Sequence, residues 1–167
     1  PRTHGSPEGS SRCTFPSPMK LRVFLVDDHP VVRGGLKALI DAQPDLRDIG
    51  EAADGLASIA AVIESKPDVV VMDLSMPLLG GAEATERIKA ACPGVKVLGL
   101  TAHEDRGYVQ VLLDAGASGF VLKRAAAEDL VRAIRAVALG GMYIDAAVMS
   151  EVLPARRRSA RSTDAAD

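Results

Sequence analysis

The stretch VVVMDLSMP, residues 69–77, is a run of apolar, strand-forming residues that stops abruptly at Asp73 and then enters a proline turn. Apolar side chains on both faces of a strand are typical of a parallel sheet that helices cover on both sides. A carboxylate at the end of such a strand costs free energy unless a nearby group interacts with its charge. The stretch therefore predicts a buried strand that delivers Asp73 to a functional site.

Similar strand-like runs alternate with helical patterns between residues 21 and 139. The predicted strands cover residues 21–26, 47–52, 68–72, 96–101 and 119–122. Apolar residues recur at helical spacing after each strand: Val32, Leu36, Leu39 and Ile40; Leu56, Ile59, Ala60 and Ile63; Ile88 and Ala91; Val109, Leu112 and Leu113; Leu130, Ile134 and Val137. Five such units predict an α/β fold with a doubly wound, five-stranded parallel sheet in the flavodoxin-like order 2-1-3-4-5 and helices on both faces.

The composition excludes several classes of function. The 167 residues are 47% hydrophobic and 25% charged, with a net charge of −2, so no overall field favours nucleic acid or an anionic membrane. Cys13 and Cys92 lie far apart without the spacing of metal ligands or of a disulfide framework. No apolar stretch reaches the roughly 18 residues of a membrane span. A cytoplasmic protein without membrane contact is expected.

Both ends of the chain differ from its middle. Residues 1–18 are rich in proline, serine and glycine and are predicted to be a disordered leader or a vector-derived extension, with Met19 as the natural start. Residues 19–140 form the predicted folded domain. Residues 141–167 contain a cluster of arginines but are too short and too irregular for a helix-turn-helix domain. They are predicted to be a C-terminal extension or linker, so that an effector domain has been cut off or the folded domain stands alone.

Charged and polar residues stand at the ends of four predicted strands. Asp27 and Asp28 follow the first strand, Asp73 the third and Lys123 the fifth, and Thr101 closes the fourth. In the order 2-1-3-4-5 these side chains meet at one edge of the sheet. Converging carboxylates repel each other and raise at least one pKa unless a cation joins them. A hard divalent ion with oxygen ligands, Mg²⁺ or Mn²⁺, would remove this conflict.

The placement of these groups predicts a phosphoryl-transfer site. Asp73 is central and would be the nucleophile that accepts the phosphoryl group. Lys123 would neutralise an incoming oxygen, and Thr101 would donate a hydrogen bond to it. The predicted metal ligands are the carboxylates of Asp27, Asp28 and Asp73 and the backbone carbonyl of Ser75.

Each of these residues also has an ordinary structural explanation. Asp27 or Asp28 alone could help to begin a helix at Pro30, because acidic residues are favoured near helix N-termini. His29 and His103 could be metal ligands or phosphohistidine donors, but no second ligand stands at a useful spacing from either. His29 is therefore predicted to be structural or to face solvent. The joint placement of five polar residues at strand ends favours the phosphoryl site.

Four segments carry a resemblance to a known family. VDDHP (26–30), VVVMDLSMPLLGG (69–81), LTAHE (100–104) and FVLKR (120–124) resemble the CheY-like receiver domains of two-component response regulators. The resemblance covers roughly residues 20–140. The segment DDHPVVRGGL is most similar to the NarL/FixJ (LuxR-type) subfamily, whose members usually carry a C-terminal DNA-binding domain that is absent from this chain.

The resemblance implies a signalling function. A sensor histidine kinase would pass a phosphoryl group to Asp73 in the presence of Mg²⁺, and the acyl phosphate would hydrolyse slowly, so the domain would not be an enzyme beyond these autocatalytic steps. Thr101 and Phe120 would rearrange and shift a surface formed by the fourth helix, fifth strand and fifth helix. This surface would control a transcription-regulating domain that contacts DNA.

The resemblance also implies secondary roles near the acceptor. Ser75 and His103 would tune the lifetime of the acyl phosphate, and the small side chain of Ala102 would leave the phosphodonor a path. Surface left over on the fourth and fifth helices, such as Tyr108 or Val131, could serve a homodimer contact.

Three other functions remain open alternatives. The first is a stand-alone receiver that acts through protein–protein contacts. The second is a haloacid-dehalogenase-like phosphatase, but such enzymes place a second aspartate two residues after the nucleophile, where this chain has Ser75. The third is a nucleotide- or flavin-binding module, which would need a glycine-rich loop where this chain has DDHPVV.

Overall fold

The computed structural model describes residues 20–76, 78–102, 106–125 and 127–145. The predicted leader, most of the predicted linker and His103 lie outside the described residues. The elements in chain order are β1 (Leu21–Val26), α1 (Pro30–Asp41), β2 (Leu46–Ala52), α2 (Gly55–Ser65), β3 (Val69–Asp73), α3 (Gly81–Ala91), β4 (Lys96–Thr101), α4 (Arg106–Asp114), β5 (Gly119–Leu122), α5 (Ala127–Ala138) and β6 (Tyr143–Ile144).

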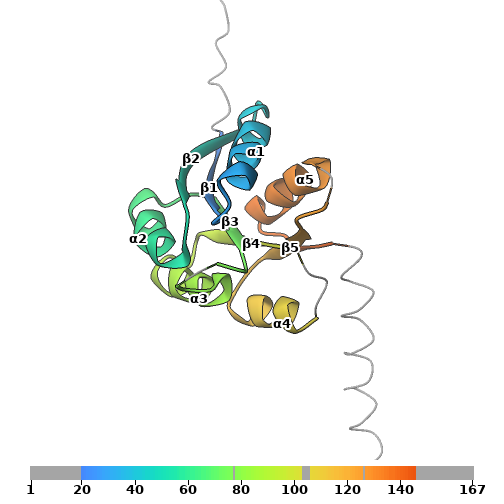
Figure 1. The fold of residues 1–167 in the computed structure, drawn as a ribbon. Coiled ribbons are helices and arrows are strands. Elements are labelled where there is room, and N and C mark those ends of the chain that lie inside the picture. The colour runs from blue at the N-terminus through green and yellow to red at the C-terminus, as the bar shows by residue number, and fades with distance from the viewer. Residues whose placement is uncertain (1–19, 77, 103–105, 126, 146–167) are drawn as a thin grey trace, which may run out of the picture.

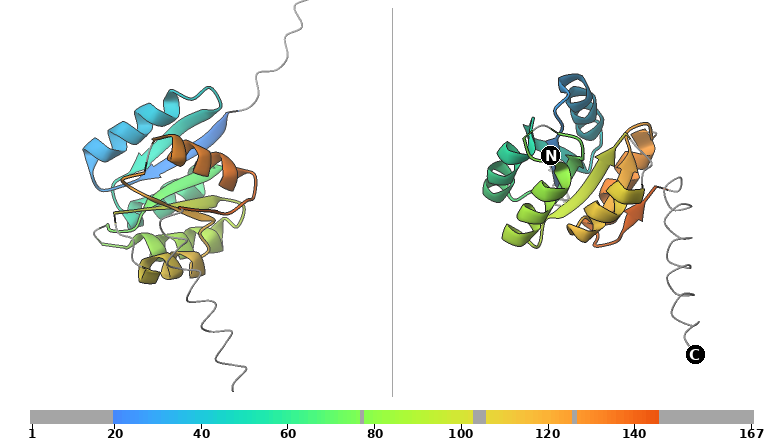
Figure 2. Two further views of the ribbon diagram at one scale, coloured as in Figure 1. Left: turned by 90° about the vertical axis from the view of Figure 1, so that its right-hand side faces the viewer. Right: turned by 60° about the horizontal axis from the view of Figure 1, so that its bottom comes forward.

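The sheet is parallel, with strand order β2-β1-β3-β4-β5-β6 (Figure 1). Helices α1 and α5 cover one face, and α2, α3 and α4 cover the other (Figures 1 and 2). The predicted fold class and the order 2-1-3-4-5 are confirmed. The two-residue strand β6 was not predicted; it lies in the segment expected to be a linker and pairs with β5 through Tyr143 and Ile144.

The strand bounds follow the sequence pattern closely. Strands β1, β4 and β5 have the predicted bounds, and β2 begins one residue earlier. Strand β3 is shifted by one residue, so Asp73 is its last member instead of the first residue after it. Every residue of β3 is at most 1% exposed, because the sheet buries this strand on both faces. Asp73 is therefore fixed by the strand itself.

The helices differ in how well their apolar spacing predicts the buried face. In α5, Leu130, Ile134 and Val137 are buried as predicted. Of the remaining stripe residues, Ile40, Ile88, Val109 and Leu112 are buried, Val32, Leu36, Leu39 and Leu113 are half-buried, and Ala91 is exposed.

The predicted core stripe of α2 is wrong. Leu56 is 55% and Ile63 39% exposed, Ala60 is exposed and Ile59 is half-buried. The buried residues of this helix are instead Gly55, Ser58 and Val62. The Ser58 hydroxyl donates a hydrogen bond to the Gly55 carbonyl at 2.6 Å and is thereby satisfied inside the protein. The start of α2 therefore packs so closely against its neighbours that small residues, and not the larger apolar ones, occupy its buried face there.

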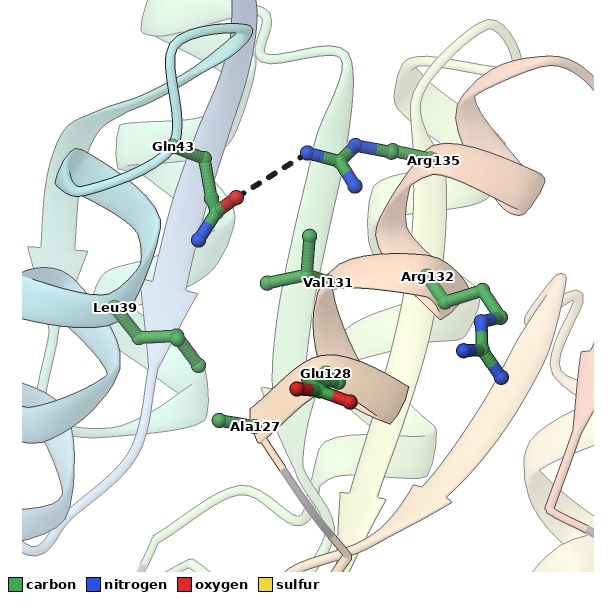
Figure 3. Close-up of a pocket in the computed structure, with 7 residues that line it drawn as sticks. All are labelled: Leu39, Gln43, Ala127, Glu128, Val131, Arg132 and Arg135. Atoms are coloured by element: carbon green, nitrogen blue, oxygen red, sulfur yellow. Dashed lines mark hydrogen bonds between the residues drawn. The ribbon is translucent and has the colours of Figure 1, made fainter.

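Helices α1 and α5 lie side by side over one face of the sheet with a groove between them, and at one end of this groove α5 is linked to the loop that follows α1 (Figure 1). Arg135 donates hydrogen bonds to both carboxylate oxygens of Asp45, at 2.7 and 2.8 Å. It also donates to the Gln43 side chain at 3.3 Å (Figure 3). Val131 lines this groove and is only 4% exposed. The expectation that Val131 is leftover surface for a dimer contact is therefore wrong; the Tyr108 side chain lies outside the described part.

The loop between β3 and α3 holds a backbone conformation that leucine rarely adopts. Leu78 has φ = 70°, in the left-handed region, and its side chain is 85% exposed. No packing of the side chain offsets this local strain.

Replacing Leu78 by asparagine is expected to stabilise the protein. Asparagine tolerates the left-handed region better than leucine, so Leu78→Asn should raise the free energy of unfolding by about 0.5–1 kcal/mol. Urea denaturation followed by circular dichroism measures this change. Leu139→Asn is the matched control, because Leu139 is 91% exposed without a positive φ. An equal gain in both variants would assign the effect to lost apolar surface and contradict the strain.

Candidate functional site

Three of the predicted residues meet at the carboxyl edge of the sheet. Asp27 follows β1, Asp73 ends the neighbouring strand β3, and Lys123 follows β5. The Lys123 ammonium lies 3.1 Å from Asp27 Oδ2 and 3.1 Å from Asp73 Oδ2. Asp27 and Asp73 are 0% and 1% exposed, so both carboxylates of this ion triad are shielded from water. The predicted convergence of strand ends is confirmed for these side chains.

The electrostatics of the triad follow from burial and from the like charges. Burial raises the pKa of Asp73, and the Asp27 carboxylate raises it further, against the opposing effects of Lys123 and the Ser75 N–H. Burial alone would lower the pKa of Lys123, but its contacts with Asp27 and Asp73 outweigh burial and leave that pKa raised. The expected rise of a carboxylate pKa is confirmed, and Lys123 remains a cation that supports ionised Asp73.

The turn after β1 brings a third carboxylate and an imidazole to the same place. The His29 backbone N–H donates to Asp27 Oδ1 at 2.8 Å. The His29 ring nitrogen Nδ1 lies 2.9 Å from Asp28 Oδ1 and 3.2 Å from Asp27 Oδ1. The ring is 62% exposed, so its prediction as a solvent-facing residue is confirmed. Its contact with both carboxylates was not predicted, because spacing rules search for distant ligands and not for the next residue.

The alternative role of these acids in starting α1 is not what the structure shows. His29 is the residue that precedes α1, its side chain makes no capping hydrogen bond, and the first turn of α1 contains no acidic residue. The Asp27 side chain instead closes the turn onto the His29 N–H. Asp28 is 27% exposed and stays open toward solvent at the rim of the site.

The cluster suits a hard cation. One ligand atom each from Asp27, Asp28, His29 and Asp73 can be chosen so that all lie within 4.8 Å of one another. Within the described part of the chain, Asp27 Oδ2, Asp28 Oδ1 and Asp73 Oδ2 are buried and accept no hydrogen bond of regular geometry, although Lys123 Nζ or His29 Nδ1 lies near each of them. Carboxylate oxygens with open lone pairs are the ligands that Mg²⁺ prefers. The residues present therefore fit a divalent ion.

The remaining predicted residues surround this cluster. Thr101 is 2% exposed at the end of β4, and its carbonyl accepts a hydrogen bond from the Lys123 N–H at 2.6 Å. The Ser75 N–H donates to Asp73 Oδ1 at 3.3 Å, whereas the role of the Ser75 carbonyl as a ligand stays a prediction. Ala102 is exposed. His103 lies outside the described residues.

Phe120 lies in the core and not in the cluster of charges. It is fully buried and belongs to an apolar cluster with Leu74, Val109, Leu112, Ala117 and Leu122. Because Leu74 directly follows Asp73, this cluster begins next to the proposed acceptor. A switching movement of Phe120 stays a prediction.

Comparisons with known proteins agree with this geometry. A family model described as the response regulator receiver domain matches residues 23–135. The chain is 37% identical to the transcriptional regulatory protein DegU of Brevibacillus brevis over 139 residues, 83% of this chain and 59% of DegU. It is 40% identical to the transcriptional regulatory protein LiaR of Bacillus subtilis over 139 residues, 83% of this chain and 66% of LiaR.

The fold is also similar to solved structures. A two-component response regulator of the LuxR family from Aurantimonas sp. SI85-9A1 superposes with a TM-score of 0.79 at 36% identity, covering 82% of this chain and 98% of that chain. The isolated REC domain of RcsB from Salmonella enterica, solved with the phosphomimetic BeF₃⁻, gives a TM-score of 0.72 at 28% identity, covering 78% and 97% of the two chains. The chain spans 59% to 66% of the length of DegU and LiaR. Among the described helices, none is long and apolar enough to cross a bilayer.

Proposed function

Because the chain belongs to the response regulator receiver domains of two-component systems, in their LuxR family, we propose that it accepts a phosphoryl group on Asp73 from a sensor histidine kinase. The observation that carries the proposal is the position of Lys123, 3.1 Å from a carboxylate oxygen of each of the buried residues Asp27 and Asp73. Burying the two carboxylates of this ion triad is costly for stability and is expected where chemistry requires it.

The transfer would be a displacement at phosphorus. An Asp73 carboxylate oxygen supplies the electron pair of the new P–O bond, while the P–N bond to the donor imidazole breaks and its electron pair returns to the ring nitrogen, which takes up a proton from water. Lys123 stays positively charged and steadies the ionised carboxylate before the attack. The phosphorylated state ends when water attacks the same phosphorus, which releases inorganic phosphate and restores the Asp73 carboxylate.

Asp27 and Asp28, together with Asp73, would hold Mg²⁺ or Mn²⁺, which would neutralise negative charge on the phosphoryl oxygens. The Thr101 hydroxyl would donate a hydrogen bond to one of these oxygens. We propose no catalysis on a second substrate: the domain promotes its own phosphorylation and dephosphorylation. The phosphatase alternative is disfavoured because an exposed serine, Ser75, stands two residues after Asp73.

The output of the domain is proposed to be transcriptional. DegU and LiaR are named transcriptional regulatory proteins, and this chain matches only part of their length. A phosphoryl-dependent shift of Thr101 and Phe120 would alter the surface of α4, β5 and α5 and thereby control a DNA-binding domain. A stand-alone receiver that acts through protein contacts, or a homodimer, is the alternative output.

The direct test is intact-mass measurement after incubation with acetyl phosphate and Mg²⁺, followed by mapping of the modified residue. We expect one phosphoryl group per chain, located on Asp73, and none when the divalent ion is removed by chelation. Stable modification of any other residue, or of none in the presence of Mg²⁺, would contradict the proposal.

Replacing Asp28 by asparagine tests the metal ligands. Asp28→Asn removes a charged ligand at the rim of the site and leaves no cavity in the core. The affinity for Mg²⁺ should fall by about tenfold or more, because removing even a residue that only orients a metal ligand typically costs about that much. Isothermal titration calorimetry measures the affinity. Asp114→Asn is the control, because this acid lies on α4 and accepts a hydrogen bond from Gln110. Equal affinity of Asp28→Asn and the wild type would remove Asp28 from the ligand set.

A further inference from the structure

Arg33 lies in the first part of α1 and has no part in the transfer chemistry described above. Its side chain is only 18% exposed, and its Nη1 donates a hydrogen bond to the backbone carbonyl of Asp27 at 2.6 Å. Its Nε lies 3.4 Å from the Glu51 carboxylate on β2. A guanidinium that reaches from a helix to a buried carbonyl on a neighbouring turn holds that turn in place, because both groups would lose hydration without the contact.

The contact completes a set of fixed atoms around Asp27. The Asp27 N–H donates to the Ala52 carbonyl of β2 at 3.1 Å, and Asp27 Oδ1 accepts the N–H of His29 at 2.8 Å. With Arg33 on the carbonyl, three polar groups of this residue are held. The fourth, Oδ2, is left to face Lys123 without a regular hydrogen bond among the described residues. The Asp27 carboxylate is thereby aimed into the cluster.

We propose that Arg33 is a positioning residue for the divalent-cation site, acting through the Asp27 carbonyl and not by touching the cation. The inference rests on the proposed function, since it assumes that Asp27, Asp28 and Asp73 hold the cation. By fixing the carbonyl between Asp27 and Asp28, Arg33 sets the orientation of both carboxylates before the cation arrives. A preorganised ligand set loses less conformational entropy on binding.

The sign of the effect separates positioning from simple electrostatics. Arg33 carries a positive charge close to the acids, so an effect of charge alone would make cation binding tighter when the arginine is removed. Loss of positioning predicts the opposite, weaker binding. A purely structural role predicts lower stability with unchanged affinity.

The test compares Mn²⁺ affinity, measured from the electron paramagnetic resonance signal of free Mn²⁺, in the wild type, Arg33→Ala, Arg33→Lys and Arg22→Ala. Arg22 is the matched control: its guanidinium also donates to a backbone carbonyl, that of Lys66, at 3.1 Å, but at the opposite end of β1. Circular dichroism at the titration temperature establishes that each variant is folded.

We expect Arg33→Ala to bind Mn²⁺ about tenfold more weakly than the wild type, as for other residues that orient metal ligands. Arg33→Lys should recover most of the affinity, because its ammonium can still donate to the Asp27 carbonyl, and Arg22→Ala should match the wild type. Unchanged or tighter binding by folded Arg33→Ala, or an equal loss in Arg22→Ala, would overturn the inference. Failure of the wild type to bind Mn²⁺ would instead overturn the proposed function.

Discussion

Asp73→Asn is expected to abolish acyl-phosphate formation while making the protein more stable at neutral pH. The amide cannot supply the electron pair that the carboxylate gives to phosphorus, so labelling by acetyl phosphate should fall below detection. The same change removes a buried charge from the neighbourhood of Asp27. Because burial and Asp27 raise the pKa of Asp73, its ionised form is disfavoured in the folded protein.

The sign of the stability change follows from this raised pKa. A carboxyl group whose pKa is higher in the folded than in the unfolded state binds more protons in the folded state, so ionising it lowers stability as pH rises through that interval. The wild type bears this loss as pH rises through the folded pKa of Asp73. Asp73→Asn should therefore be more stable than the wild type at pH 7, and its stability should depend less on pH.

Two measurements check the two halves of this prediction. Intact-mass analysis reports the phosphoryl group, and urea denaturation at pH 5 and pH 7 reports the free energy of unfolding. Asp68→Asn is the control, since Asp68 lies before β3 at the opposite edge and accepts the Arg22 N–H at 2.8 Å. It should be labelled like the wild type. Persistent labelling of Asp73→Asn in the same loop, or a lower stability at pH 7, would contradict the assignment of Asp73.

Much of this site could be predicted from sequence because the order of the strands determines where their ends, and the residues on them, lie. Once residues 69–73 are assigned to a central parallel strand, the strand order fixes which loops share an edge, and polar residues at those strand ends must meet. The predicted meeting of Asp27, Asp73 and Lys123 is confirmed in this way, whereas their roles stay predictions. Their meeting depends on backbone geometry alone, which alternating strands and helices determine.

The parts that sequence did not reveal depend on contacts between side chains and backbone. Arg33 stands seven residues before Ile40, at the edge of the apolar stripe of α1, and nothing in this spacing indicates that it reaches the Asp27 carbonyl. The inward face of α2 was missed because small residues pack there, whereas periodicity rules follow the large apolar ones. Strand β6 has two residues, too few to show an alternating pattern.

Replacing Lys123 by methionine should lower the free energy of unfolding by an amount that depends on pH and on the presence of Mg²⁺. Lys123→Met keeps much of the apolar stem but leaves the buried carboxylates of Asp27 and Asp73 facing each other without the ammonium. Breaking a buried ion pair typically costs 3–5 kcal/mol, and because the Lys123 side chain is 20% exposed a loss of about 2 kcal/mol at pH 7 is expected. Acetyl phosphate labelling of Asp73 should also slow, because no fixed cation steadies the ionised carboxylate.

The pH dependence identifies the origin of this loss. Without Lys123 the pKa of Asp73 rises further above its unfolded value, so the deficit is full above the folded pKa and shrinks as falling pH protonates the carboxyl group. Saturating Mg²⁺ at pH 7 should restore much of the stability, because the ion replaces the missing positive charge. Urea denaturation at pH 5 and 7, with and without Mg²⁺, measures both effects.

Lys37→Met serves as the control, because the 51% exposed side chain of Lys37 pairs at 3.1 Å with Asp48 of β2 and not with the acids of the site. Its change in stability should be the same with and without Mg²⁺. A deficit in Lys123→Met that neither lower pH nor Mg²⁺ reduces would mean that the lysine stem, through its packing, matters more than its charge. Lys123 would then act mainly through its packing, although it lies near two acids. Because the pKa of Asp73 is raised, a different cation would have to stabilise its ionised form for the attack on phosphorus.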